Sequence, residues 1–547
     1  MIRLLFVSLA LPSCSLIISD PPSAPDAGAG EPPALSCAEG ERADEIGRVC
    51  VPMTGTRTCE AGASVDAEHA WLKEASTVLY AAPQAAGDGS GSDAGNAGSL
   101  EAMVAAAGAE ATAVLLAPGT YTLSDPLALA VRGPLSLVGP CAEQVSIELG
   151  TPMTTSGSVQ LYGLAVRGPL SAEEGASGSA IIVSGSGTFK LVQSAVSAPA
   201  GHGVELTGAG SDAAVISGVT FGAVRDSALH ATDALGSWTV TGNLSKGPIG
   251  AHGLSITGGD AALTISSNRF EAISGDALRA SDALGSWTIE GNLSKGPIGG
   301  DGISIAGGSA EAQVTINNNE FERIDGNGIS AQDALGSWTI EGNLSRGPIG
   351  GHAMHFHNQS GVISLNNNTV SGGDGVTSGA AKGIVIVRGS AAWSVTNNTI
   401  SGTVRTGPQL GLGFGGLEAG ASVTVSDNTI TGAGGVGLGF LNNLATAALS
   451  GNVVSDTWSE VGGGLARAGL GIALVDSSAI TLTENTVQNN AFAGVLIDLA
   501  RWDDTERGVA QLTITDTTSA GNNQGTGRDV VLQNIPDTAQ VTITNSG

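Results

Sequence analysis

The sequence predicts an all-β solenoid, in which short strands stack coil upon coil along one axis. The nineteen-residue stretch from Asp282 to Gly300, DALGSWTIEGNLSKGPIGG, recurs almost unchanged from Asp233 and again from Asp333. Of 547 residues, 83 are Gly and 3% are aromatic, which is typical of many short strands joined by tight turns. Such strands bury their apolar faces only when the next coil covers them.

A shorter repeat of about 25 residues underlies the long one. Each unit is an alternating strand that ends in Asn, as in WTVTGN, LTISSN and VTINNN. Apolar residues lie five and three positions before the Asn and polar ones four and two before it, the period of two that a strand with one buried face requires. The duplicated stretch is therefore a pair of coils, and weaker copies on both sides bring the total to about sixteen. The series comprises Asn243, Asn268, Asn292, Asn319, Asn343, Asn368, Asn398, Asn428, Asn452 and Asn485.

The N-N-x-[IVF] turns and G-[IL]-x-[IL]-x-G strands resemble those of the right-handed parallel β-helix of the pectate-lyase-like superfamily, over residues 75–547. The resemblance implies a single-stranded right-handed parallel β-helix across 71–547, with the turn Asn residues stacked inside as an amide ladder. The stretch beginning TVLYAAPQ at Thr77 resembles the usual start of such domains and implies an N-terminal capping segment with a helix at about 100–107.

The N-terminal residues predict an export signal followed by a flexible linker. Residues 1–13 combine a basic start at Arg3 with an apolar run too short to span a bilayer, which predicts a signal peptide. The letters LPSC resemble a bacterial lipobox, which implies lipidation of Cys14; ordinary cleaved secretion is the alternative. Residues 14–34 are rich in Pro, Ala, Gly and acid and predict a disordered linker. We therefore expect a lipid-anchored protein on the outer-membrane surface of a bacterium, or an extracellular one.

Four further cysteines mark a small Cys-rich segment, 35–70, and one early coil. An even number of Cys in an exported chain predicts disulfides, and zinc is the alternative although no paired CxxC is present. Three connectivities are open, and we favour the pairing of neighbours in sequence. The residues are Cys37, Cys50, Cys59 and Cys141.

The charge balance excludes one class of partner. The net charge is −28 and only 22 residues are Lys or Arg, with no basic patch. Such a chain repels nucleic acid and anionic membrane surfaces. We therefore expect no nucleic-acid partner, and membrane attachment only through a lipid anchor.

A strip of polar residues follows one side of the predicted coils. All His residues except His69 belong to it, so we predict that it binds polysaccharide. The outward columns contain Glu205, His230, Arg279 and His355, then Gln332 and His357. The position before the Gly of each second strand is occupied by His202, Ser227, His252, Asp276, Asp301, Asn327, His352 and Lys382, and then by Leu410, Val436, Leu470 and Ala493. The predicted substrate-binding residues are His202, His252, Asn327, His352, His355, His357 and Lys382.

Catalysis is the alternative use of the strip. Adjacent coils place Asp276 and Asp301 about 5 Å apart, where two carboxylates share a proton, bind a cation or turn apart. Oxygen ligands from both and from Asn327 suit calcium. With Arg279 beside them, the set is similar to that of pectate lyases, where calcium and an Arg base act on a uronate. These residues would then be the catalytic centre of a calcium-dependent polysaccharide lyase.

Other interpretations of the same strip stay open. A carboxyl pair at that spacing also matches a retaining glycoside hydrolase. Against catalysis, the Asp pair that precedes Gly-His-Gly in polygalacturonases is missing before Gly201–Gly203. A strip that only solvates an exposed sheet would make the chain a non-catalytic adhesin or structural rod. The sequence therefore leaves open whether the protein is an enzyme.

Three further features allow two interpretations each. HAMHFH, residues 352–357, offers three His for a transition metal, or a solvated pH-sensitive face with Met354 and Phe356 pointing inward. Long insertions containing Arg405, Trp458 and Arg467 either wall a groove or cover the apolar part of the column. The third feature is a column of Trp with the parity of core residues, which predicts burial rather than sugar stacking. It contains Trp238, Trp287, Trp338 and Trp393.

Overall fold

The structure is a computed structural model in which the chain divides into two compact units, Met1–Val51 and Pro52–Gly547. Two short strands, β1 (Glu41–Ala43) and β2 (Cys50–Pro52), pair with each other. The predicted signal, linker and lipidation site, and most of the Cys-rich segment, lie outside the described residues and stay predictions. The described residues are 41–43, 50–52, 75–129, 132–171, 178–207, 213–282, 285–372, 382–402, 410–443, 445–457, 468–474, 479–491, 493–498, 511–522, 530–533 and 540–546.

Three parallel sheets make up the second unit. Sheet 1 consists of β3 (Thr77–Ala81), β4 (Thr112–Leu116), β7 (Leu135–Val138), β10 (Val159–Tyr162), β13 (Thr188–Val192), β16 (Ala213–Ser217), β19 (Ser237–Thr241), β22 (Ala262–Ser266), β25 (Trp287–Glu290), β28 (Gln313–Asn317), β31 (Ser337–Glu341), β34 (Val362–Asn366), β37 (Ala392–Thr396), β40 (Ser422–Ser426), β43 (Thr446–Ser450), β46 (Ala479–Thr483), β49 (Gln511–Thr515) and β52 (Gln540–Thr544). Sheet 2 consists of β5 (Gly119–Leu123), β8 (Val145–Leu149), β11 (Ala165–Arg167), β14 (Ala195–Ala198), β17 (Thr220–Val224), β20 (Leu244–Ile249), β23 (Arg269–Ile273), β26 (Leu293–Ile298), β29 (Glu320–Ile324), β32 (Leu344–Gly347), β35 (Thr369–Gly372), β38 (Thr399–Ser401), β41 (Thr429–Thr431), β44 (Val453–Ser455), β47 (Thr486–Gln488) and β50 (Thr518–Ala520). Sheet 3 consists of β6 (Ala128–Leu129), β9 (Met153–Thr155), β12 (Ile181–Ser184), β15 (Val204–Thr207), β18 (Leu229–Ala234), β21 (Leu254–Gly259), β24 (Leu278–Ser281), β27 (Ile303–Ala306), β30 (Ile329–Gln332), β33 (His352–Gln359), β36 (Lys382–Gly389), β39 (Leu410–Gly415), β42 (Val436–Asn443), β45 (Ala468–Leu474), β48 (Ala493–Asp498) and β51 (Val530–Gln533).

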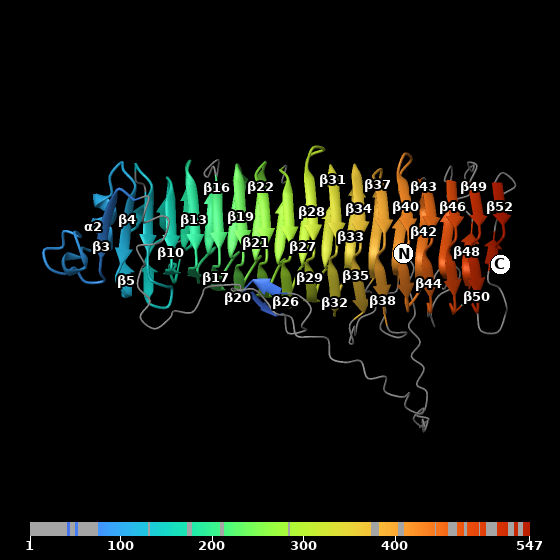
Figure 1. Ribbon diagram of the computed structural model, residues 1–547, viewed down its shortest axis with the longest axis horizontal. Coiled ribbons are helices and arrows are strands. Elements are labelled where there is room, and N and C mark those ends of the chain that lie inside the picture. The colour runs from blue at the N-terminus through green and yellow to red at the C-terminus, as the bar shows by residue number, and fades with distance from the viewer. Residues whose placement is uncertain are drawn as a thin grey trace, which may run out of the picture. The chain divides into compact units, whose positions relative to one another are not determined.

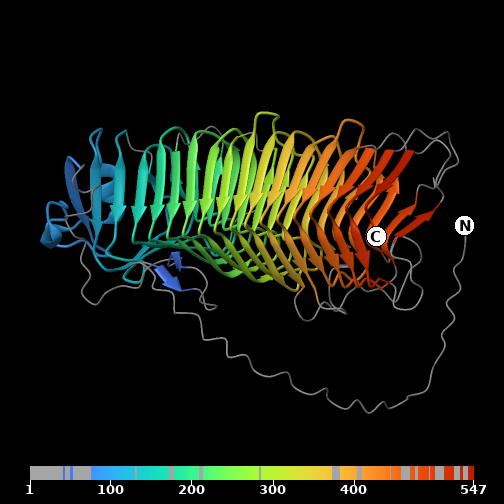
Figure 2. The same cartoon turned by 45° about the vertical axis from the view of Figure 1, so that its right-hand side comes forward.

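Each coil contributes one strand to each sheet, and each strand pairs in parallel with its equivalent one coil away (Figure 1, Figure 2). Thus β19, β20 and β21 form one coil, and β22, β23 and β24 form the next, with Trp238 opposite Leu263 and Leu254 opposite Leu278. The predicted parallel β-helix is therefore confirmed.

The predicted amide ladder is present between sheets 1 and 2. The ten Asn residues from Asn243 to Asn485 are at most 5% exposed. In the first nine, Nδ2 donates to Oδ1 of the next Asn at 2.8–3.0 Å, and the backbone N–H donates to the same oxygen at 2.9–3.1 Å. Every buried amide is thereby satisfied by its neighbours, which a side chain without both donor and acceptor cannot do.

The residue before each ladder Asn adopts a left-handed conformation. Its φ ranges from 54° to 65°, with Gly242 at 63° and Asn318 at 54°. Gly enters this region at the lowest cost and Asn or Asp at less cost than most residues, although Ser267 and Glu484 adopt it as well. This requirement explains the recurring letters GN, NN and DN in the repeat.

A second, shorter ladder follows the last strands of sheet 2 and was not predicted. Asn490 Nδ2 donates to Asn522 Oδ1 at 2.8 Å, and Asn490 Oδ1 accepts from the backbone N–H of Thr457 at 3.0 Å. The paired letters NN at 489–490 were the available signal. The late coils are therefore fixed by two ladders instead of one.

The core confirms the expectation for the Trp column, whose four members are 3–4% exposed. Trp287 lies between Leu263 and Val314 in the register of sheet 1, so large and smaller apolar side chains alternate along the core. Phe356 packs edge-on against Trp393 with ring centroids 5.4 Å apart. These rings are therefore not available to stack on sugars.

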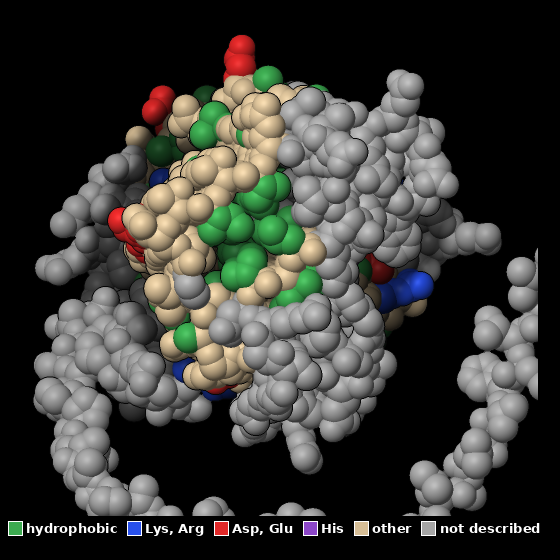
Figure 3. All heavy atoms as spheres, turned by 90° about the vertical axis from the view of Figure 1, so that its right-hand side faces the viewer, with side chains coloured by type: hydrophobic (Ala, Val, Ile, Leu, Met, Phe, Trp, Pro, Cys, Tyr) green, Lys and Arg blue, Asp and Glu red, His purple; other side chains and the backbone are tan. Residues whose placement is uncertain are grey.

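The two ends of the described β-helix differ. At the N-terminal end, α2 (Leu100–Ala106) begins after Ser99, whose Oγ accepts from the N–H of Ala102, and buries Leu100, Met103 and Val104, which confirms the capping helix. Figure 3 looks at the other end, where apolar side chains are visible near the centre. Ile543 on β52 is 47% exposed there. Within the described ranges, no helix is long and apolar enough to cross a membrane.

Candidate functional site

The polar strip lies along sheet 3 and the turns that enter it. We use the name for the turn column from His202 to His352 together with the outward residues Glu205, His230, Arg279, His355, Gln332 and His357. The register confirms the predicted neighbours: Glu205 is opposite His230, and Gln332 is opposite His357. The backbone of Lys382 continues the column opposite His352, but its side chain lies outside the described set. The binding roles of these residues stay predictions.

The turn column is itself a hydrogen-bonded ladder, which the sequence analysis missed. Each side chain accepts a hydrogen bond from the backbone N–H of the equivalent residue on the next coil. We call this ladder the acceptor column. It is built from His, Ser, Asp and Asn because each of these side chains offers an acceptor atom close to the main chain. The bonds run from Ser227 N to His202 Nδ1 (3.1 Å), His252 N to Ser227 Oγ (3.3 Å), Asp276 N to His252 Nδ1 (3.0 Å), Asp301 N to Asp276 Oδ1 (2.7 Å), Asn327 N to Asp301 Oδ1 (2.6 Å) and His352 N to Asn327 Oδ1 (2.8 Å).

The two carboxylates of the predicted catalytic centre are adjacent members of this column. Asp276 is 9% exposed, and its Oδ2 lies 3.5 Å from His252 Nδ1. Asp301 Oδ1 also accepts from Asn327 Nδ2 at 3.0 Å. Burial raises the pKa of Asp301, and the charge of Asp276 adds to the shift, while hydrogen bonds from Asn327 oppose it. Each carboxylate of the pair therefore points along the ladder toward the backbone N–H of the next coil.

The predicted calcium ligands are Asp276, Asp301 and Asn327. One carboxylate or amide oxygen of each already accepts a backbone N–H. No group of three or more His, Cys, Asp or Glu among the described residues is arranged to hold a metal ion. Calcium needs six to eight oxygen ligands. A calcium site stays a prediction that this donor set does not favour, and so does catalysis by Asp276, Asp301 and Arg279.

The acceptor column is expected to weaken at acid pH through His252. Its Nδ1 must be unprotonated to accept from Asp276 N, and burial lowers the pKa of His252, with Asp276 opposing and Arg279 adding to the shift. Because the folded pKa lies below the unfolded value of about 6.5, the contribution is present above that pH and is lost as the pH falls through the folded pKa. We expect urea unfolding to show a steeper loss of stability between pH 7.5 and 5 for the wild type than for His252→Asn. Asn327 shows that an Asn serves in this column, and equal pH profiles would contradict the prediction.

The histidines form two clusters. The rings of His202 and His230 stack with centroids 4.5 Å apart, and burial, followed by the neighbouring His202, lowers the pKa of His230. On β33 the ring centroids of His352 and His355 are 4.9 Å apart, and those of His355 and His357 are 6.5 Å apart. Met354 and Phe356 are fully buried, as predicted. A transition metal on this cluster stays a prediction.

The outward residues are more accessible than the turn column. Arg279 is exposed and lies between Ser255 and Ser304 on the neighbouring strands. Ser179 Oγ donates to Glu205 Oε2 at 2.6 Å. The outer face of β15 to β33 therefore presents carboxylate, imidazole, hydroxyl and guanidinium groups at the spacing of the strands, about 4.8 Å.

Beyond β33 the same columns become apolar, as predicted for the turn column. Leu410 is opposite Val436, as predicted. Leu470, however, is opposite Leu438, and Ala468 is opposite Ala493. Ala468 therefore occupies the position in the turn column that the sequence analysis assigned to Leu470, two residues further along the chain. The insertion before β45 is the longest, which obscured this register. The insertions with Arg405, Trp458 and Arg467 lie outside the described residues.

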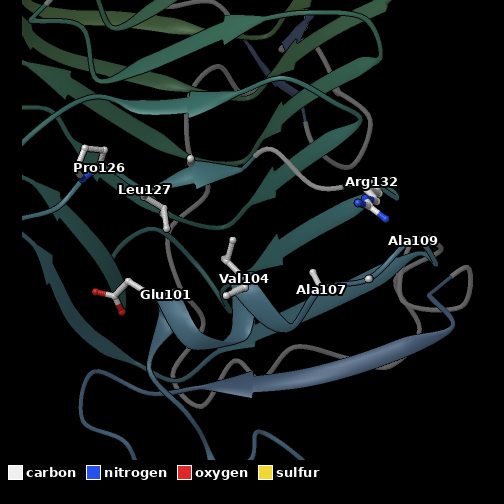
Figure 4. Close-up of a pocket in the computed structure, with 10 residues that line it drawn as sticks. Glu101, Val104, Ala107, Ala109, Pro126, Leu127 and Arg132 are labelled. Carbon is white, nitrogen blue, oxygen red and sulfur yellow. The ribbon is translucent and has the colours of Figure 1, made fainter.

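A cavity of about 510 Å³ lies on this part of sheet 3, and we call it the apolar groove. A second cavity of about 590 Å³ lies beside α2, with Glu101 and Arg132 at opposite sides (Figure 4). Cys141 is almost fully buried elsewhere in the early coils. The pairing of the four cysteines stays a prediction. The groove is lined by Val385, Val387, Arg388, Leu410, Gly413, Phe414, Gly415, Gly416, Val436, Gly439, Phe440, Leu441 and Gly471.

Several solved structures are similar to this chain at low identity. A GH87 α-1,3-glucanase from Streptomyces thermodiastaticus strain HF3-3 is 14% identical, covering 89% of this chain and 70% of that chain with a TM-score of 0.31. A mannuronic acid specific polysaccharide family 6 lyase from human gut microbiota is 12% identical, covering 84% and 92% with a TM-score of 0.32. A periplasmic alginate epimerase is 11% identical, covering 79% and 78% with a TM-score of 0.22. These likenesses concern the fold alone.

Comparison with curated proteins finds no match to this sequence. The family described as "Right handed beta helix region" matches residues 175–345, 252–418 and 301–546. Together these ranges cover more than half of the chain and the strands that carry the polar strip. The chain therefore belongs to the right-handed β-helix family.

Proposed function

We propose that the protein binds polysaccharide along the polar strip and does so at the surface of a bacterium. The outward columns of β15 to β33 carry this proposal, because they place one polar side chain per coil on a continuous face. The strand spacing of about 4.8 Å is close to the length of one sugar unit, so successive coils meet successive sugars. Export by residues 1–13 and anchoring through Cys14 belong to the same proposal.

The exposed guanidinium of one strip residue suits the carboxylate of an acidic glycan. Arg279 is exposed at the centre of the strip, and His230 and His355 lie on the same outward column. A guanidinium pairs with a carboxylate through two parallel hydrogen bonds. Uronate-rich polysaccharides are therefore the preferred class, and neutral glycans are the comparison.

The test is affinity electrophoresis and calorimetry with alginate, polygalacturonate and an α-1,3-glucan, each with calcium and with chelator. We expect the double variant Arg279→Ala, His355→Ala to bind the preferred glycan at least about tenfold more weakly, a loss of about 1.4 kcal/mol. Lys246→Ala on sheet 2 removes an exposed cation elsewhere and is the matched control. Binding that is absent for every glycan, or equal in both variants, would overturn the proposal.

Turnover is the second candidate, because Asp301 is a carboxyl whose raised pKa favours holding a proton. The same incubations are followed for unsaturated products and new reducing ends. Calcium-dependent turnover that is lost in Asp301→Asn would make the strip a catalytic site. Binding without products would leave it a binding surface.

A further inference from the structure

We propose that the polar strip and the apolar groove together bind an amphiphilic glycan. Its saccharide lies on the strip, and the alkyl or acyl chain attached to it enters the groove. This inference rests on the proposed function of the strip and names the class of glycan. It is carried by the register of sheet 3, by the glycines of the groove and by the exposure of its walls.

The strip and the groove are consecutive parts of the same columns. His355 on β33 is opposite Val385 on β36, and His357 is opposite Val387. The surface changes from imidazole to aliphatic side chains between two hydrogen-bonded strands, about 4.8 Å apart. A ligand that crosses this boundary needs a polar part bonded directly to an apolar part.

Glycines form the floor of the groove where the outward columns continue. The outward column that contains His355 and Val385 continues through Gly413, Gly439 and Gly471. The outward column that contains His357 and Val387 continues through Gly415. None of these four has a positive φ, whereas neighbouring Gly416 does, at 62°. The backbone therefore does not require glycine at these four positions. The missing side chain leaves open space above Gly415, whereas the Leu410 side chain lies over Gly413.

The space above the floor is open at one position and bordered by flexible side chains at others. A Cβ on Gly415 would have no neighbour nearer than the carbonyl oxygen of Leu441, at 4.0 Å. A Cβ on Gly439 would meet only Val436 and Leu410 side chains, at 3.2 Å and 3.4 Å or more. A side chain at Gly415 begins in open space, and one at Gly439 requires the Val436 side chain to shift slightly, which makes Gly415 the cleaner of the two test positions.

The walls are apolar and partly accessible. Leu441 is 45% exposed, and Val387, Leu410 and Val436 are half-buried. A volume of about 510 Å³ lies within the range of small-molecule sites. Arg388 is exposed at the rim and is the charged residue among the described lining.

The experiment uses n-dodecyl β-D-glucuronide and n-dodecyl β-D-maltoside below their micelle concentrations, with methyl β-D-glucuronide and maltose as chain-free probes and dodecanol as the sugar-free probe. Calorimetry on the full chain is expected to show at least tenfold tighter binding of one dodecyl glycoside than of its chain-free counterpart or of dodecanol. Gly415→Leu and Gly439→Leu fill the groove and are expected to abolish that gain. Gly222→Leu on sheet 2 is the matched control, because its Cβ would meet only ordinary contacts, at 3.7 Å.

The outcomes separate this inference from the proposed function. Equal affinity for dodecyl and chain-free glycosides, or an unchanged gain in both groove variants, would overturn the inference. Dodecanol that binds as tightly as the glycosides would overturn it as well, because the groove would then take the chain alone. Polysaccharide binding that persists in Gly415→Leu and fails in Arg279→Ala, His355→Ala would leave the proposed function standing in either case.

Discussion

Replacing Asn343 by Ala is expected to lower the free energy of unfolding by roughly 3–6 kcal/mol. Asn343 is fully buried, and its Oδ1 accepts from both the backbone N–H and Nδ2 of Asn319. Its Nδ2 donates to Ile316 O and to Asn368 Oδ1. Ala leaves the backbone N–H of Asn319 without its acceptor, at about 1–3 kcal/mol, and removes three further hydrogen bonds, at about 0.5–1.5 kcal/mol each. Asn319 Nδ2 and Asn368 Oδ1 keep other partners. Relaxation of the turn recovers part of the sum.

The measurement is urea unfolding together with hydrogen exchange of the strands around β31. A stack whose coils contact only their neighbours need not unfold as one unit, so exchange shows where protection is lost. Asn318→Gly is the matched control, because Asn318 is exposed with a positive φ that Gly adopts freely. We expect this control to change stability by less than about 0.5 kcal/mol. A similar small effect of Asn343→Ala would show that the ladder does not fix the turn.

Asp301→Ala is expected to cost about 1–3 kcal/mol, while Asp301→Asn is expected to be neutral or stabilising. Ala leaves the backbone N–H and Nδ2 of Asn327 without their acceptor, whereas Asn retains an Oδ1 at the same place. Burial raises the pKa of Asp301, so ionisation is less favourable there than in the unfolded chain, and removing the charge relieves that cost. Urea unfolding of both variants at pH 7 measures the difference.

The pH dependence gives a second, independent readout of Asp301. Because its folded pKa is above the unfolded value of 3.8, the favourable contribution of its protonated form is present below 3.8 and is lost as the pH rises through the folded pKa. The advantage of Asp301→Asn over the wild type should therefore grow across that window. An Asn variant as unstable as the Ala variant would show that the charge itself is required, as it would be for a cation ligand.

The sequence was sufficient for the features that repeat in every coil. The ladder Asn residues, the alternation before them and the Trp column each follow a strict period, so a one-dimensional pattern determines which face they occupy. The cap at α2 was predicted from a resemblance at the start of the domain. The ladder, the alternation and the Trp column depend on parity within one coil, which the letters display directly.

The acceptor column and the groove depend on contacts that the letters do not display. His252, Asp276 and Asn327 look like a solvated strip, because a turn acceptor and a solvent-facing side chain have the same polarity. The four floor glycines align only when the register across insertions of unequal length is known. Leu470 shows the difficulty, since its predicted place was shifted by the longest insertion. Side-chain direction and register therefore had to come from the structure.

The amide ladder also has a genetic consequence. The three near-identical stretches at Asp233, Asp282 and Asp333 place their Asn residues at equivalent rungs, so recombination between copies joins a complete coil to a complete coil. After such an exchange between the first and third copies, Asn343 would accept from Val219 N as Asn243 does now. A chain shortened or lengthened by pairs of coils in this way would therefore keep a partner for every ladder amide.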